Sequence, residues 1–157
     1  MKKLIAGLAL VGACHSSQPE TAPSGSRPSR AAVTNDNQTG AVDAATAVRR
    51  FLDAAKEQDL QAMGGLFGDA DGPARDRIPR SELEKRELFM ARCLRHDRYD
   101  IVGDAPNPGG GRSLVVNLSF RDLTRSSSFE VVSGPKGRWY VRQFDLTAVN
   151  DICMQRA

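Results

Sequence analysis

Residues 41–68, AVDAATAVRRFLDAAKEQDLQAMGGLFG, decide the fold class because they contain two consecutive helix signals. The first signal is a set of apolar residues at helical spacing: Ala44, Val48, Phe51, Leu52 and Ala55. Charged residues take the opposite face, so this segment predicts an amphipathic helix that packs one side on a core. Asp59 then suits the N-cap of a second, shorter helix that ends at Gly68.

A third helix is expected beyond the polar loop that contains Gly72 and Pro79. Ser81 and Glu84 have the spacing of a capping box, in which each side chain bonds to the backbone N–H of the other residue. The buried stripe of this helix is expected to contain Leu83, Met90 and Leu94, with Phe89 and Cys93 beside it.

The second half of the chain changes to a period of two, which is typical of strands. The clearest strand has apolar residues at alternate positions: Leu114, Val116, Leu118 and Phe120. Other strands are expected around Ile101, Phe129 and Val141, and the apolar phase shifts between Val141 and Phe144. Such a shift predicts a bulge that bends the sheet. The expected fold is therefore α+β, with three N-terminal helices packed on a curved antiparallel sheet of about four strands.

Residues 47–68, AVRRFLDAAKEQDLQAMGGLFG, resemble the opening of nuclear transport factor 2-like domains. In that family a first helix ends in a hydrophobic-Ala-Ala-x-x-x-Asp stretch before a second helix, and the order of elements from Ala41 to Leu146 is also similar. The resemblance implies a cone-shaped fold with a cavity at its wide end. It implies little about function, because the family includes ketosteroid isomerases, polyketide cyclases, transport adaptors and non-catalytic modules.

Residues 1–13 have the three parts of an export signal. Lys2 and Lys3 come first, a short apolar run follows, and small residues end the segment at Ala13. The apolar run has roughly ten residues, whereas a membrane-spanning helix needs about twenty. We therefore expect the segment to be removed after export.

The four residues Val11-Gly12-Ala13-Cys14 resemble the bacterial lipobox. The resemblance implies that Cys14 is diacylated, with acyl chains such as palmitate, and becomes the first residue of the mature chain. An Asp after this cysteine commonly retains lipoproteins on the inner membrane, so His15 implies the outer membrane, or the cell surface in a one-membrane organism. The alternative is an ordinary secreted protein with a chance cysteine.

Residues 14–40 follow as a segment rich in Ser, Pro, Thr, Gly and Asn, which predicts a disordered tether from the lipid to a folded domain at 41–157. Removal of Lys2 and Lys3 lowers the formal net charge from +3 to +1. Because nucleic-acid binding usually requires a basic surface, we expect no nucleic-acid partner.

Cys93 and Cys153 form an even pair once Cys14 carries lipid. Disulfides persist in the exported compartment, so we expect these two cysteines to be bonded. The chain-entropy model gives such a bridge about 4 kcal/mol of stabilisation. The alternative is two buried thiols.

No catalytic residue, metal site or cofactor is expected. Asp69-Ala70-Asp71-Gly72 fails as a calcium loop, because apolar residues would occupy its first and last ligand positions. His96 fits a cation at a helix C-terminus better than a general base. The residue types of a ketosteroid isomerase site are present, but their spacing does not predict convergence: Tyr99, Asp100, Tyr140 and Asp145.

Arginine and aromatic residues suggest a binding surface for a partner or ligand. The candidates are Arg95, Arg98, Tyr99, Trp139 and Arg142. The alternative is a solvated row of arginines on the third helix. The sequence thus predicts a membrane-anchored envelope lipoprotein with a non-catalytic binding or accessory domain, whose partner is an envelope protein or a small apolar ligand. Two alternatives stay open: a cavity enzyme of the ketosteroid isomerase or polyketide cyclase type, and a structural envelope component.

Overall fold

The structure, a computed structural model, describes residues 39–155. The α-helices are α2 (Ala44–Glu57), α3 (Leu60–Leu66), α4 (Arg80–Cys93) and α5 (Asn150–Met154). The strands are β1 (Gly68–Asp69), β2 (Gly72–Pro73), β3 (Arg98–Pro106), β4 (Arg112–Phe120), β5 (Leu123–Ser133) and β6 (Trp139–Phe144). Three short 3-10 helices complete the elements: η1 (Ala74–Asp76), η2 (Pro135–Gly137) and η3 (Thr147–Val149).

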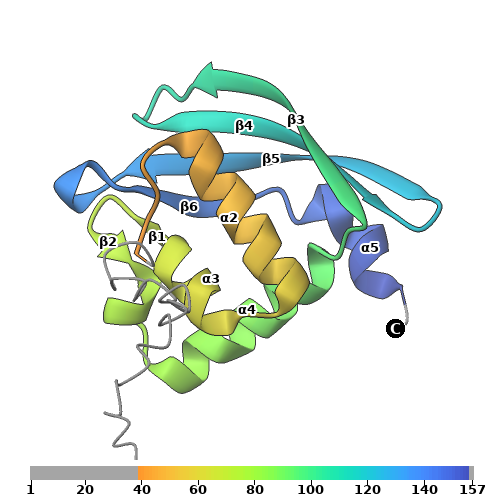
Figure 1. Ribbon diagram of the computed structural model, residues 1–157, viewed down its shortest axis with the longest axis horizontal. Coiled ribbons are helices and arrows are strands. Elements are labelled where there is room, and N and C mark those ends of the chain that lie inside the picture. The colour runs from red at the N-terminus through yellow and green to blue at the C-terminus, as the bar shows by residue number, and fades with distance from the viewer. Residues whose placement is uncertain (1–38, 156–157) are drawn as a thin grey trace, which may run out of the picture. The chain divides into compact units, whose positions relative to one another are not determined.

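The four long strands form one antiparallel sheet in the order β3-β4-β5-β6. Figure 1 shows that this sheet is curved and that α2 runs across one of its faces, with α3 and α4 beyond it. Consistent with this view, α2 contacts β4, β5 and β6 on one side and α3 and α4 on the other. The domain is thus a layer of sheet covered on one face by helices.

Helix α2 forms where the sequence predicts it, because residues at both of its ends suit helix caps and its apolar residues lie on one face. The Asp43 side chain caps the N-terminus by accepting a hydrogen bond from the Thr46 backbone N–H at 2.7 Å. Gln58 ends the helix in the left-handed conformation, with φ of 55°. Phe51 and Leu52 are fully buried against the sheet and the other helices.

The sheet contributes the other half of the core through alternate residues. Leu114, Val116 and Leu118 of β4 are fully buried, while the intervening residues are partly exposed. Phe129 and Val131 of β5 lie on the same side and are also fully buried. This alternation is the period of two that the sequence displays.

Two bulges accompany the bend of the sheet. Glu130 pairs with Gln143 while Val131 pairs with Val141, so Arg142 is the extra residue on β6. This confirms the bulge that the apolar phase shift predicts. A second bulge at Val102 of β3 has no counterpart in the sequence analysis.

The expected fold of three N-terminal helices packed on a single sheet of about four strands is wrong. Within residues 39–155 there are four α-helices, of which α5 follows the sheet, and a second sheet, β1-β2, lies between α3 and α4. The sequence pattern missed these elements because a five-residue helix and two-residue strands are too short to show a period.

Helix α4 also departs from expectation in its start and in its buried face. Pro79, and not a Ser81–Glu84 capping box, occupies the N-cap, and Glu84 instead accepts a hydrogen bond from Arg80. Phe89 is 51% exposed, whereas Glu87 is only 1% exposed. The helix therefore buries a carboxyl group and leaves an aromatic ring in solvent.

The expected signal at 1–13, the lipid site at Cys14 and almost all of the expected tether lie outside the described residues. Thr39 and Gly40, the last two residues of that segment, are attached to the domain: the Gly40 N–H donates to the Gly65 carbonyl at 2.8 Å, and Arg138 Nε donates to the Thr39 carbonyl at 3.0 Å. Between residues 39 and 155, no helix has the length and apolar character needed to cross a membrane.

Candidate functional site

The structure separates the residues that the sequence proposed as one binding surface. Tyr99 lies on β3 and Trp139 on β6, which are opposite edges of the main sheet. Tyr99 is in register with Leu118 and through it with Arg125 of β5, while Trp139 is in register with Ser133. Arg125 and Ser133 are eight residues apart on one strand, which corresponds to about 26 Å.

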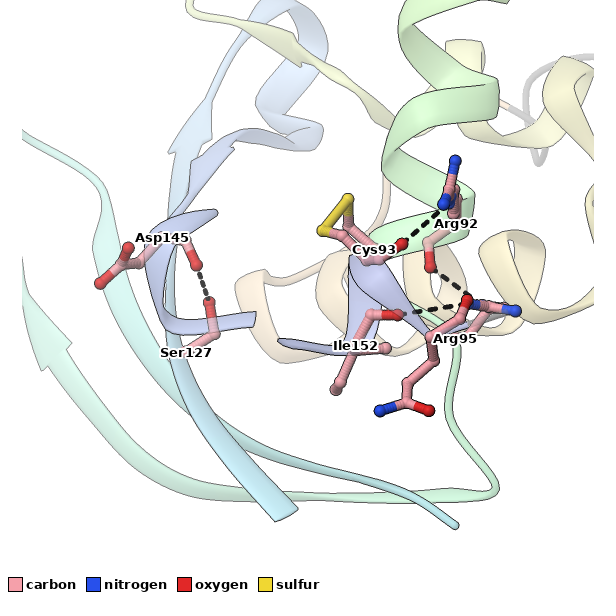
Figure 2. The surroundings of a disulfide bond; sticks show 8 residues. Arg92, Cys93, Arg95, Ser127, Asp145 and Ile152 are labelled. Carbon is pink, nitrogen blue, oxygen red and sulfur yellow. Dashed lines mark hydrogen bonds between the residues drawn. A yellow bond between two sulfur atoms is a disulfide. The ribbon is translucent and has the colours of Figure 1, made fainter. Parts of the chain in front are cut away.

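Arg95 holds the C-terminal part of the chain instead of facing a partner (Figure 2). Its guanidinium donates to the carbonyls of Ile152, at 3.2 Å, and of Gln155, and it lies 5.0 Å from the centroid of the Phe120 ring. Arg92 makes a similar contact, since its Nε donates to the Cys153 carbonyl at 2.8 Å. The two arginines thus bind carbonyls at the C-terminal end of α5.

The other candidates have separate local contacts. The Tyr99 hydroxyl donates to Asp53 Oδ1 at 3.2 Å. Trp139 exchanges two backbone hydrogen bonds with Ala41. Arg142 is paired with Glu130, and Arg98 is exposed at the start of β3.

The structure joins Cys93 and Cys153 as a disulfide between the end of α4 and α5, with the two Cα atoms 4.0 Å apart (Figure 2). Both residues are buried, and 60 positions separate them in the chain. The buried Ser127 hydroxyl donates to the Asp145 carbonyl at 3.0 Å.

His96 is buried, and its Nδ1 donates to the Leu94 carbonyl at 2.8 Å. Burial lowers the pKa of this ring. Burial therefore disfavours the charged form of His96 and counts against its interpretation as a helix C-terminal cation.

The residue types of a ketosteroid isomerase site do not converge either. Tyr99 and Asp100 belong to β3, whereas Tyr140 belongs to β6 and Asp145 follows it, so the two pairs lie at opposite edges of the sheet.

Glu87 of α4 is the most unusual ionisable residue in the described part of the chain. Its side chain is almost completely enclosed, and Oε1 is the one buried side-chain oxygen or nitrogen among residues 39–155 that has no hydrogen-bond partner. Burial, helped by the nearby Glu84 carboxylate, raises the pKa of Glu87 to about 7. A buried carboxyl group without a partner requires an explanation, because such groups are normally hydrogen-bonded.

Glu87 lines a pocket of about 230 Å³ between α3, η1 and α4. The residues around it are Leu60, Gln61 and Gly64 from α3, Arg75 and Asp76 from η1, and Arg80, Leu83, Glu84 and Glu87 from α4. We call this the Glu87 pocket. Its wall combines apolar surface with charged groups, as small-molecule sites do.

Gly64 permits the close approach of α3 to the carboxyl group. A Cβ at this position would lie 2.6 Å from Glu87 Oε1 and 3.2 Å from Leu83 Cδ2. Only a residue without a side chain therefore leaves this space to the Glu87 carboxyl group.

A second hollow of about 410 Å³ lies on the other side of η1. Its wall includes Thr39, Pro135, Lys136 and Tyr140, and Asp76 lines both hollows. Lys136 adopts a left-handed conformation with φ of 57°. Asp76 is thus part of the wall of both hollows.

The Glu87 pocket can accept a hydrogen bond or exchange a proton near neutral pH. The raised pKa of the Glu87 carboxyl group lies in the range that is useful for general acid–base catalysis. Among residues 39–155, no group of three or more His, Cys, Asp or Glu side chains is placed to hold a metal ion.

Glu87 is not among the residues predicted for a site, although the sequence contains a signal for its burial. Leu83 and Met90 lie on the buried stripe of α4 seven positions apart, and Glu87 lies between them, four positions after Leu83. A charged residue at a stripe position is a candidate for a buried ionisable group.

Comparison of the chain with protein-family models, with curated proteins and with solved structures finds no match to any of them. The resemblances to nuclear transport factor 2-like domains and to the lipobox therefore stay predictions from the sequence.

Proposed function

We propose that the chain is a lipid-anchored envelope protein whose folded domain is a non-catalytic module that binds a small ligand beside η1. The anchor is the acylated Cys14, which the sequence predicts, and the ligand site is the Glu87 pocket. The observation that carries the binding role is the enclosed Glu87 carboxyl group, whose Oε1 has no partner within the described residues.

The Cys93–Cys153 disulfide supports the exported location. Structural disulfides form and persist in oxidising compartments and are rare in the reducing cytosol. This bond is independent of the first fourteen residues, so it is a separate argument for the same compartment.

A second candidate is an acid–base enzyme that acts on a small substrate in the same pocket. The observation in its favour is the raised pKa of Glu87, together with the neighbouring Glu84 carboxylate. Paired carboxyl groups with different pKa values serve as acid and base in known enzymes.

The anchor is tested by growing cells with an alkyne analogue of palmitate and labelling the chain and its Cys14→Ser variant. We expect label on the wild type in the membrane fraction and none on the variant. Equal label on both proteins contradicts the anchor.

The binding role is tested by the melting temperature of the purified chain against a panel of small metabolites, since a ligand that binds only the folded state raises this temperature. We expect at least one ligand to raise the melting temperature of the wild type and to leave that of Glu87→Gln unchanged. If NMR spectra show that the chain converts this ligand to a product, the domain is an enzyme and not a binding module.

A further inference from the structure

The Glu87 pocket has the charge and hydrogen-bonding pattern of a site for a small primary ammonium compound. From the placement of its side chains we infer that this pocket binds the ammonium group of such a compound, with Glu87 Oε1 as the acceptor. This inference rests on the proposed binding function and names its ligand class.

The first argument is the unfilled acceptor. Glu87 Oε1 is enclosed, and no described residue donates a hydrogen bond to it. A buried acceptor that is left unpaired destabilises the folded state relative to a paired one. A ligand N–H that reaches this oxygen removes that penalty.

The second argument is the charge balance of the wall. Arg80 Nε lies 2.6 Å from Glu84 Oε1, so these two groups neutralise each other. Arg75 and Asp76 are neighbours on η1 and have opposite charges. The Glu87 carboxylate is the remaining charge, so a ligand with a single positive charge makes the occupied pocket neutral.

The third argument is size. The pocket holds about 230 Å³, below the roughly 300–1,000 Å³ of sites for drug-sized ligands. Leu60 and Leu83 supply apolar surface for a short alkyl group next to the ammonium. The ligand is therefore a small amine, not a large or multiply charged one.

Binding depends on pH because the ammonium requires the ionised form of Glu87. The charged groups that face this carboxyl are Arg75 and Asp76 from η1 and Arg80 and Glu84 from α4, whereas α3 contributes only Leu60, Gln61 and Gly64. The pKa of Glu87 is about 7. Its ionised fraction thus rises from about one tenth at pH 6 to about nine tenths at pH 8, and affinity rises about tenfold. Alkylammonium groups stay charged throughout, because their pKa is near that of lysine.

The test is a titration of the full chain with methylammonium chloride, followed in ¹H–¹⁵N spectra at pH 6 and pH 8. We expect saturable shifts at the backbone amides of Gly64, Leu83 and Glu87, with a dissociation constant about tenfold lower at pH 8. Tetramethylammonium has the same charge but no N–H donor, so it is expected to shift these amides much less.

Two variants make the test specific. Glu87→Gln keeps the size of the side chain, and we expect it to weaken methylammonium binding at least tenfold at pH 8 and to abolish the pH dependence. Glu82→Gln is the matched control, because Glu82 is on the same helix, pairs with Arg86 and lies outside the pocket. This control is expected to bind as the wild type does.

The inference is overturned if methylammonium produces no saturable shifts at the pocket at either pH, or if tetramethylammonium binds equally well. The wild-type pH series and the tetramethylammonium comparison decide this even if Glu87→Gln does not fold. If the chain carries lipid on Cys14 but does not bind methylammonium, this inference alone is contradicted. If the chain binds methylammonium but carries no lipid on Cys14, the inference is supported and the proposed anchor is contradicted.

Discussion

Glu87 differs from its neighbours on α4 in its surroundings, not in its chemistry. Glu82 and Glu84 lie at or near the surface and form ion pairs with Arg86 and Arg80. Glu87 is enclosed, and burial raises its pKa from an ordinary value of 4.5 to about 7. Between these two values the folded chain binds more protons than the unfolded chain, so the wild type loses stability as the pH rises through this window.

Glu87→Gln therefore changes stability in a pH-dependent way. The amide resembles the protonated carboxyl group, so we expect little change in the free energy of unfolding at pH 4.5. At pH 8 the wild type must hold an enclosed carboxylate, and the variant is expected to be more stable by about 1–3 kcal/mol. Urea unfolding of both proteins at the two pH values measures this difference.

Glu82→Gln is the control for this comparison, because its carboxylate is exposed in an i,i+4 pair. Such pairs contribute about 0.3–0.5 kcal/mol, so the control should stay within that range at both pH values. A Glu87→Gln variant that is less stable than the wild type at pH 8 would show that the carboxylate has a partner in the folded state.

For single residues, the sequence predicts burial well where side chains are apolar and poorly where they are charged. Phe51, Leu52 and Val116 were expected in the core and are there. Phe89 was also placed near the core but is half exposed, while Glu87 took a core position. Hydrophobic periodicity ranks residues by side-chain type, so it cannot assign a charged side chain to the interior without its neighbours in three dimensions.

Helix α5 is too short to be stable by itself, and its attachments explain why it forms. The disulfide joins Cys153 to α4, and Arg92 and Arg95 donate to carbonyls at its C-terminal end. Ile152 and Val149 are fully buried in the core next to these contacts. A covalent bond, hydrogen bonds and apolar packing therefore act on the same short segment.

The Arg95 contacts predict a loss of stability in Arg95→Gln. Removal of its bonds to the Ile152 and Gln155 carbonyls and of its contact with the Phe120 ring should lower the free energy of unfolding by about 1–2 kcal/mol. The matched control is Arg98→Gln, since Arg98 is exposed at the start of β3 and should change stability by less than about 0.5 kcal/mol. Equal effects in urea unfolding would show that Arg95 does not hold α5.

Reduction of the Cys93–Cys153 bond predicts a larger change. The bond closes a loop of 60 positions, and the chain-entropy model gives about 4 kcal/mol for it. Urea unfolding with and without a reducing agent measures this value, and the intact mass should rise by two hydrogen atoms on reduction. A chain whose mass does not change on reduction has no disulfide.

The sequence predicts the longer elements because they have several periods, and it misses the short ones. The α2 helix and the four long strands follow from spacing alone. The β1-β2 hairpin and α5 depend on contacts with distant segments: Phe67 bridges to Val141, and Cys153 bonds to Cys93. The arginine and aromatic residues proposed for binding are not brought together for the same reason, since strand order places Tyr99 and Trp139 at opposite sheet edges.

At the scale of the whole molecule, two independent features support the proposal that the protein is exported. One is the lipobox-like Val11-Gly12-Ala13-Cys14 segment, and the other is the buried disulfide in the folded domain. If Cys14 carries the proposed lipid, the domain is tethered to a membrane. The domain would then meet its ligand at the membrane surface, with the Glu87 pocket as the contact site.

The most direct test of this account is the intact mass of the chain purified from bacterial membranes without reduction. The account predicts a chain that begins at Cys14, carries the added mass of a diacylglyceryl group with or without an N-acyl chain, and lacks two hydrogen atoms because of the disulfide. A mass equal to that of the unmodified Met1–Ala157 chain, or of a shorter chain without lipid, would contradict it.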